Sequence, residues 1–154
     1  RPASGEGTID DAIAAIGAEA PLTPEDEALW DRIAPGLAGE TRFRPPRVRD
    51  FATEFGIDEK DVRCVLRLTQ KLGRTDQIAH DHFFARATTR EMVSIIRDLA
   101  GPGNDWFTAP AFRDRVQNGR KVAIEILDFY DRQGVTLRRG DLRRINPHRA
   151  DLFG

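Results

Sequence analysis

The stretch from residue 113 to residue 145 places the strongest constraint on how this chain folds. Within it, an amphipathic segment over Arg120–Gln133 ends at Gly134 and is followed by two short extended runs that meet at Gly140-Asp141. A glycine at the position of Gly134 is typical of a helix end, and a glycine at the position of Gly140 is typical of a hairpin tip. A helix followed by a basic hairpin predicts a winged helix-turn-helix, whose wing holds phosphates. The wing arginines are Arg138, Arg139, Arg143 and Arg144.

The length and the cysteine content limit the class of protein. A chain of 154 residues holds one ordinary domain or two small ones. The single Cys64 excludes a disulfide framework and a cysteine-based zinc site, which indicates a reducing, cytoplasmic compartment. The apolar runs are short and no charged-then-apolar leader opens the chain, so we expect neither a membrane span nor secretion. A first residue other than methionine suggests a fragment of a larger protein.

The net charge of −1 conceals an uneven distribution of charge along the chain. Residues 1–41 carry nine acidic and two basic side chains, residues 42–104 carry nine and twelve, and residues 105–154 carry seven and ten. Local charge sets the field that a phosphate feels, because the Debye length is about 8 Å at physiological salt. The basic remainder of the chain is therefore compatible with nucleic-acid binding.

Turn and cap signals divide the chain into a leading segment and two similar halves. Residues 1–23 are expected to be a linker or the remnant of a preceding winged helix. Residues 24–87 and 88–154 are each expected to form a winged-helix module, so the fold class is mainly α with small β-hairpins, in tandem winged-helix domains. The first half should contain a helix capped by Thr23 and opened by Pro24, a helix over 44–56, a helix from the Asp58 cap to Leu72, and a hairpin over 75–86.

The order of elements repeats in the second half, which indicates a tandem repeat. Phe43–Asp50 matches Phe107–Asp114 at an offset of 64, whereas Lys71–Thr75 matches Arg132–Thr136 at an offset of 61. The three-residue difference is expected between the second and third helices. The second half should contain a helix capped by Thr88 or Thr89 and ended by Gly101, a helix over 106–116, a helix capped by Asn118, and the wing.

Two cations, Arg120 and Lys121, stand in the first turn of the last expected helix. There they oppose the helix dipole at a cost of about 0.3–1 kcal/mol, while the free N–H groups of a helix start attract anions. A phosphate contact is the favoured interpretation, and solvated side chains are the alternative. In the wing, alternation sends neighbouring arginines to opposite faces. They can contact nucleic acid, or act as edge charges that prevent strand aggregation.

The other polar clusters are assigned to the surface. The third helix of the first half carries Arg63, Arg67 and Lys71 at spacings of four, which we interpret as a solvated face rather than a second backbone contact. His80 and His82 share a strand face in an exposed hairpin but lack a third ligand, so no metal site is expected.

The remaining candidates are structural. Cys64 is expected to fill the core, and Trp106 and Tyr130 to be structural, with stacking on a base as the alternative. No phosphate loop, H-E-x-x-H or G-x-S-x-G motif is present, so the chain is expected to be a binding module and not an enzyme.

One stretch resembles a known family. It reads Gly-Arg-Lys-Val-Ala-Ile-Glu-Ile-Leu-Asp-Phe-Tyr-Asp over 119–131 and continues with Val-Thr-Leu-Arg-Arg-Gly-Asp over 135–141. This run, with Leu152-Phe153 near the end and Glu27-Ala-Leu-Trp30 earlier, is similar to the C-terminal winged-helix region of bacterial selenocysteine-specific elongation factors (SelB). Leu137 stands where the family commonly has arginine, which shifts the wing arginine pair by one position.

The resemblance implies a function. In this family, amino-terminal domains bind GTP and selenocysteinyl-tRNA, and the last winged helix grips an mRNA hairpin, the selenocysteine insertion element, beside a UGA codon. Residues 88–154 would then be the RNA-binding module of a monomer without metal or cofactor of its own. GTP, Mg²⁺, the ribosome and selenocysteinyl-tRNA would engage the parent, a cytoplasmic GTPase. The expected RNA-binding residues are Arg115, Arg120, Lys121, Arg138, Arg139, Arg143 and Arg144.

The physics of RNA recognition favours a hairpin loop as target. The A-form major groove excludes a helix, so sequence is read from splayed loop bases. We expect these bases in the groove between the second helix and the wing, with phosphates held at Arg115, Arg120 and Lys121. A DNA-binding transcription regulator is the alternative, disfavoured because the outward face of the last helix carries Glu125 and Asp128, as well as Asp131. A protein-interaction scaffold is the third possibility.

Overall fold

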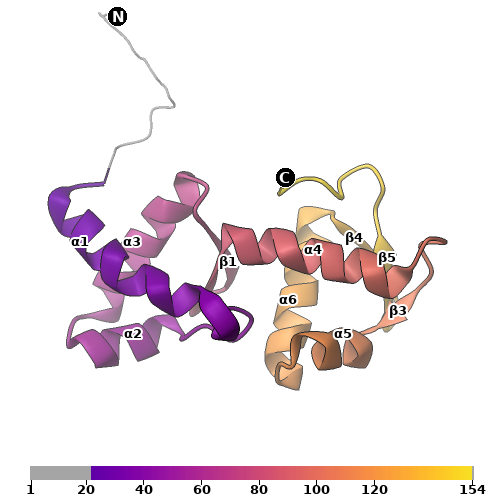
Figure 1. Cartoon of the computed structure of the whole chain (residues 1–154), viewed down its shortest axis with the longest axis horizontal. Helices are drawn as coiled ribbons and strands as arrows, with labels where there is room; N and C mark the ends of the chain where they lie inside the picture. Colours follow the sequence, from indigo (N-terminus) through magenta and orange to yellow (C-terminus); the bar gives the residue numbers. More distant parts are fainter. Residues whose placement is uncertain (1–21, 154) are drawn as a thin grey trace, which may run out of the picture.

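The computed structural model describes residues 22–153, in which two sets of three α-helices each end in an antiparallel hairpin (Figure 1). The expected fold class, mainly α with small hairpins in tandem winged-helix domains, is confirmed. The expectation for residues 1–23 lies almost wholly outside the described range. None of the helices between residues 22 and 153 combines the length and the apolar character that crossing a membrane requires.

The first set begins at the expected cap. Thr23 Oγ1 accepts a hydrogen bond from Asp26 N at 3.0 Å, and Asp26 Oδ2 accepts one from Thr23 N at 3.3 Å, which forms a capping box. The helix expected over 44–56 begins only at Val48, because Pro45 and Pro46 hold the residues before them outside the helical region. The elements are α1 (Pro24–Ile33), the 3-10 turns η1 (Ala34–Leu37) and η2 (Gly39–Thr41), α2 (Val48–Phe55), α3 (Glu59–Lys71), β1 (Thr75–Ala79) and β2 (His82–Ala85).

The second set contains one strand that the sequence did not reveal. The expected helix over 106–116 begins only at Ala109, because Phe107 and Thr108 pair with Arg143 and Leu142 of the wing. The sheet order is therefore β3-β5-β4, with the last strand in the centre. The elements are α4 (Arg86–Ala100), β3 (Phe107–Thr108), α5 (Ala109–Val116), α6 (Arg120–Gln133), β4 (Thr136–Arg139) and β5 (Leu142–Ile145).

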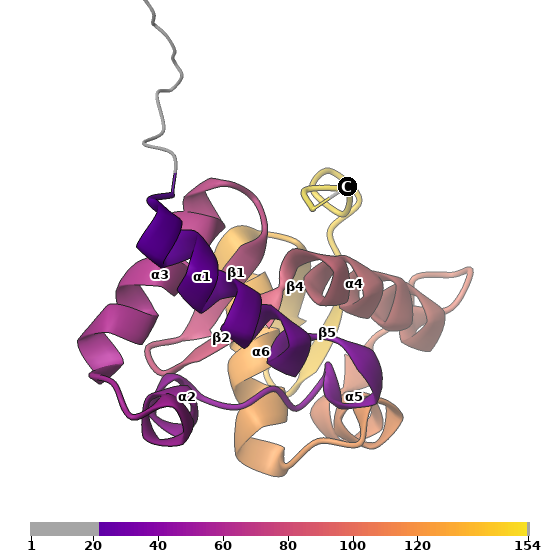
Figure 2. The same cartoon turned by 60° about the vertical axis from the view of Figure 1, so that its left-hand side comes forward.

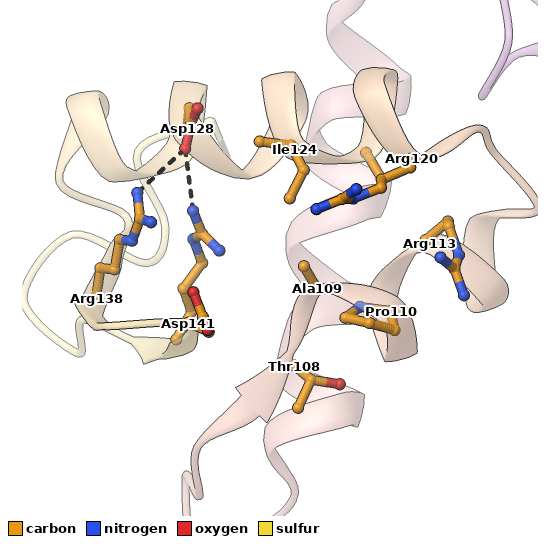
Figure 3. Close-up of a pocket in the computed structure, with 11 residues that line it drawn as sticks. Thr108, Ala109, Pro110, Arg113, Arg120, Ile124, Asp128, Arg138 and Asp141 are labelled. Carbon is orange, nitrogen blue, oxygen red and sulfur yellow. Dashed lines mark hydrogen bonds and ion pairs between the residues drawn. The ribbon is translucent and has the colours of Figure 1, made fainter.

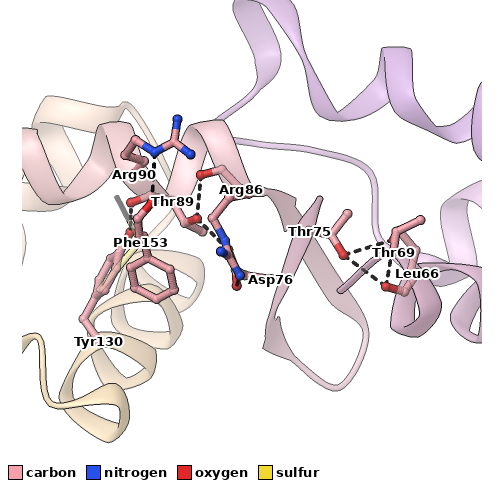
Figure 4. Close-up of polar contacts among 9 residues, drawn as sticks. All are labelled: Leu66, Thr69, Thr75, Asp76, Arg86, Thr89, Arg90, Tyr130 and Phe153. Atoms are coloured by element: carbon pink, nitrogen blue, oxygen red, sulfur yellow. Dashed lines mark hydrogen bonds and ion pairs between the residues drawn. The ribbon is translucent and has the colours of Figure 1, made fainter. Parts of the chain in front are cut away.

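The two sets are joined without a linker. β2 ends at Ala85 and α4 begins at Arg86, so the expected cap at Thr88 or Thr89 is wrong: both threonines are buried inside the helix. Thr89 Oγ1 lies 2.6 Å from Asp76 Oδ2, which holds α4 against the first hairpin (Figure 4). We propose a division after Ala85, and name residues 22–85 the first unit and residues 86–153 the second unit.

The repeat has a single register. α2 and α5 begin at Val48 and Ala109, and α3 and α6 begin at Glu59 and Arg120, an offset of 61 in both cases. The offset of 64 expected ahead of the second helix is therefore wrong, because it aligned shared letters rather than inward-facing positions. At an offset of 61, two buried phenylalanines correspond, Phe51 and Phe112.

Each unit has a hydrophobic core, but the first hairpin serves both. Phe83 packs among the buried side chains of the first unit, whereas Ile78 and Phe84 belong to the core of the second. Figures 1 and 2 show this hairpin between the two helical sets. Arg42 Nε and Nη2 donate to the Glu91 carboxylate at 2.7 and 2.8 Å, so a surface ion pair also bridges the units. The two units therefore form one packed body.

Candidate nucleic-acid interface

A hollow of about 500 Å³ lies between α5, α6 and the wing, and we name it the wing pocket (Figure 3). The expected groove between the second helix of this unit and the wing is therefore present. Its walls combine an apolar floor with four arginines. The lining residues are Thr108, Ala109, Pro110, Arg113, Arg120, Ala123, Ile124, Asp128, Arg138, Asp141 and Arg143.

The start of α6 places one cation in this pocket. Arg120 points into the pocket from the first turn of α6 (Figure 3). Gly119 is the N-cap residue and no side chain caps the helix, so the expected Asn118 cap is wrong. Asn118 Nδ2 instead donates to Phe43 O, which ties the start of α6 to the first unit. Lys121, one residue on, lines a different hollow against the first unit. The predicted pair of cations is therefore divided between two surfaces.

The wing arginines alternate as predicted. Arg138 lies opposite Arg143 in the ladder, on the face toward α6. Arg139 and Arg144 occupy the other face, where their guanidinium carbons lie 4.8 and 4.6 Å from the centre of the Trp106 ring. Cation–π contacts of this kind stabilise both partners. Two of the four arginines therefore cover Trp106, and two face the pocket.

Arg143 is buried, and its role differs from that of an exposed phosphate ligand. Only 2% of the residue is exposed, and its guanidinium donates to Asp131 Oδ2 and Asp128 Oδ1, both at 3.0 Å. Thr136 Oγ1 donates to the second oxygen of Asp131 at 2.5 Å. Two of the three carboxylates expected to face a DNA groove, Asp128 and Asp131, thus bind the wing, whereas Glu125 lines the hollow against the first unit. Arg143 fixes the wing against α6. Arg138, half exposed and 3.6 Å from Asp128 Oδ1, is the more accessible of the two cations on this face.

A pocket residue that the sequence did not single out is Arg113. α5 begins at Ala109, so Arg113, four residues on, lies on the same helix face and lines the pocket. Arg115, which was predicted to bind RNA, is not among the lining residues, and its Nη1 lies 2.5 Å from Asp98 Oδ2 of α4. The signal that separates them is helical phase, because side chains two residues apart point about 200° apart around a helix.

Several other residues lie elsewhere than expected. Cys64 is exposed on α3 rather than in the core. Tyr130 is fully buried, donates to Thr89 O at 2.6 Å and cannot stack on a base, and burial raises its pKa well above the usual value. His82 is buried rather than exposed: its Nε2 lies 2.7 Å from Pro45 O, and burial lowers its pKa. Residues 22–153 contain no group of three or more potential metal ligands.

Comparison with known proteins points to one family. Residues 103–145 match the family model described as elongation factor SelB, winged helix. The chain is 37% identical over 123 residues to the selenocysteine-specific elongation factor of Escherichia coli (strain K12), which covers 80% of this chain and 19% of that protein. It is 30% identical over 101 residues to the factor of Desulfomicrobium baculatum, covering 66% of this chain and 16% of that protein. The chain thus spans less than a fifth of the length of these relatives.

Solved structures agree with the sequence comparison. The mRNA-binding domain of elongation factor SelB from E. coli, solved in complex with SECIS RNA, is 36% identical, with a TM-score of 0.71. The match covers 81% of this chain and 99% of that domain. A bacterial selenocysteine-specific elongation factor, EF-Sec, shares the fold at 19% identity, with a TM-score of 0.57 over 80% of this chain and 18% of that one. The chain therefore belongs to the SelB elongation-factor family, of which it spans a winged-helix region.

Proposed function

We propose that this chain is the mRNA-hairpin-binding part of a selenocysteine-specific elongation factor. The observation that carries the proposal is the likeness over almost the whole length of a SelB domain that was solved with SECIS RNA. By this function the second unit recognises a selenocysteine insertion element, so that the adjacent UGA is recoded. The chain acts as a monomer in the cytoplasm. GTP and Mg²⁺, the ribosome and selenocysteinyl-tRNA belong to the longer parent protein and not to this region.

The wing pocket is the proposed site for the RNA loop. Its apolar floor, formed by Ala109, Ala123 and Ile124, suits the face of an unstacked base, since base recognition in RNA relies on stacking and edge contacts. Arg120 and Arg138 approach this floor from opposite sides, from α6 and from the wing (Figure 3). A loop that inserts a base here meets a cation on either flank.

The proposed contacts revise the expected set. Arg120 and Arg138 remain direct contacts, and Arg113 is added, because all three line the pocket. Arg143 is assigned to holding the wing because it is buried, and Arg115 is left outside because it faces Asp98. Further contacts remain proposed at the predicted residues Lys121, Arg139 and Arg144.

Replacing Arg120 by alanine is expected to weaken binding of a selenocysteine-insertion hairpin about tenfold and to lower the salt slope by about one. The cause is the loss of one phosphate-neutralising cation at the pocket wall. Fluorescence anisotropy over several salt concentrations measures both quantities. Arg115→Ala is the matched control, since it removes the same charge from the same unit outside the pocket. Equal effects of the two substitutions would remove the wing pocket from the proposal.

The same titration separates the proposal from its alternatives. The probes are the hairpin, the hairpin with a scrambled loop, and a DNA duplex. Loop-dependent binding supports the proposed function. Equal, salt-dependent binding of all three would reduce the second unit to a general basic winged helix, and binding of none would favour a protein-interaction scaffold.

A further inference from the structure

A second hollow, of about 170 Å³, lies where the first unit meets α6, and we name it the junction cleft. Arg47 and Arg49 enter it from the start of α2, and Lys121 enters it from the start of α6. The tip of the first hairpin closes one side. Since the two units are packed together through Arg42, Phe43 and the shared hairpin, the cleft is a built feature of the body.

The balance of charge in the junction cleft is positive. Its carboxylates are Asp81 and Glu125, but Asp81 is already engaged by Arg63 at 3.3 Å and lies 3.6 Å from Arg49. Arg47 and Lys121 form no ion pair with a carboxylate of residues 22–153. The Arg49 side chain is 60% exposed, so a ligand in the cleft can reach it. Three cations against two carboxylates leave the cleft with a net positive charge, which favours an anion.

The junction cleft adjoins the wing pocket through consecutive residues. Successive side chains on a helix diverge by about 100°, so Arg120 faces the wing pocket while Lys121 faces the first unit. The uncapped start of α6, with its free N–H groups, lies between them. An RNA strand that leaves the wing pocket across the start of α6 therefore reaches the junction cleft next.

We propose that the junction cleft binds a backbone phosphate of the RNA stem, held between Lys121 of the second unit and Arg47 and Arg49 of the first. This inference rests on the proposed function, because it extends the footprint of the same hairpin onto the first unit. The wing pocket takes the loop, and the cleft takes the stem. The first unit is thereby a contributor to RNA affinity and not only a spacer.

His82 supplies a reporter within the cleft. Its Nε2 donates to Pro45 O at 2.7 Å, so the neutral ring carries its lone pair on Nδ1, which is buried and has no hydrogen-bond partner among the described residues. Burial lowers the pKa of this imidazole in the free protein. A phosphate in the cleft favours the imidazolium form, so RNA binding should raise the pKa of His82 and take up a proton. The charged and titratable groups around this ring are Arg47, Arg49, His80, Asp81, Lys121 and Glu125.

The test compares hairpins that share a loop but differ in stem length. The double substitution Arg47→Ala with Arg49→Ala is expected to lower the salt slope for the long-stem hairpin by about one, because one phosphate contact is lost, and to lower its affinity at least tenfold. Binding of a minimal hairpin, with only the loop-closing pairs, should stay within twofold of the unsubstituted protein. The matched control is Arg67→Ala with Lys71→Ala, which removes the same charge from the exposed face of α3. Thermal unfolding verifies that each variant is folded.

The outcomes separate the two proposals. Arg120→Ala should weaken binding of both hairpins, and a protein that binds neither would refute the proposed function itself. If the protein binds both hairpins but the Arg47, Arg49 variant binds the long stem as tightly as the unsubstituted protein does, the cleft does not hold the stem. The same conclusion follows if the α3 control has an equal effect.

The ring nitrogens of His82, followed by NMR across a pH series, give an independent readout. A higher pKa with the long-stem hairpin than in the free protein supports the proposal, and an unchanged pKa contradicts it. Inorganic phosphate alone forms the second arm. If it shifts the His82 signals and the hairpin does not, the cleft is a site for small anions rather than for RNA.

Discussion

Replacing Arg143 by methionine is expected to lower the free energy of unfolding of the second unit by about 3 kcal/mol. Removing one partner of a buried ion pair typically costs about 3–5 kcal/mol, and the partial exposure of Asp128 places this pair at the lower end. Asp131 would be left with only the Thr136 hydroxyl, and Asp128 with only the more distant Arg138, as partners beneath the wing. Urea unfolding measures the change.

Two controls show whether charge is the cause. Arg139→Met makes the same change on the opposite, exposed face of the wing and should cost less than about 1 kcal/mol. Adding Asp128→Asn and Asp131→Asn to Arg143→Met should restore part of the lost stability, because both sides of the pair are then neutral. If the triple variant is no more stable than Arg143→Met alone, lost packing and not the unpaired carboxylates explains the effect. Because Arg143→Met no longer holds the wing against α6, its affinity for the selenocysteine-insertion hairpin should also fall.

The second large effect is expected at Phe84, where alanine should cost about 3–5 kcal/mol because the side chain is fully buried. Phe84 lies in the hairpin of the first unit yet packs in the core of the second, so the damage should appear in the second unit. Trp30 and Trp106 lie in different units, so single-tryptophan variants report the two unfolding transitions separately. Phe84→Ala should lower the urea midpoint seen by Trp106 more than the one seen by Trp30.

Phe83→Ala is the natural counterpart to this substitution. The neighbouring phenylalanine is equally buried but belongs to the core of the first unit, so it should lower the midpoint seen by Trp30 more. The pair thus compares two adjacent residues of one strand that point into two different cores. Should both substitutions shift both probes equally, the two units would unfold as a single cooperative body rather than as separable ones.

Local signals in the sequence were sufficient for most helices and for both hairpins. These signals act on residues close to them in sequence, so a short segment is enough to predict the element. Examples are Thr23 and Pro24 at a helix start, Gly134 at a helix end and Gly140-Asp141 at a hairpin tip. β3 was missed because a two-residue strand has no periodicity of its own and forms only when β5 lies beside it. Its presence moved the start of α5 from residue 106 to Ala109.

The candidate site was predictable in charge but not in geometry. Arg120 and Arg138 were recognised from their positions at a helix start and in a hairpin, and the structure places both at the wing pocket. The burial of Arg143 depends on Asp128 and Asp131, more than ten residues away in sequence, and the burial of His82 depends on Pro45. Contacts of this kind are set by how elements pack, and no local pattern encodes them.

The direct passage from β2 into α4 affects how an RNA hairpin bound to the second unit is positioned relative to the first unit. Flexible linkers spread a captured ligand over a volume that grows with their length, which dilutes it relative to any neighbouring site. Here Ala85, the last residue of β2, is followed at once by Arg86, the first residue of α4. Ile78 and Phe84 of the first hairpin also pack in the core of the second unit. The two units are therefore held in a fixed relative orientation. Under the proposed function, an RNA bound to the second unit is held at a defined distance and angle from the start of α1, at a high effective concentration.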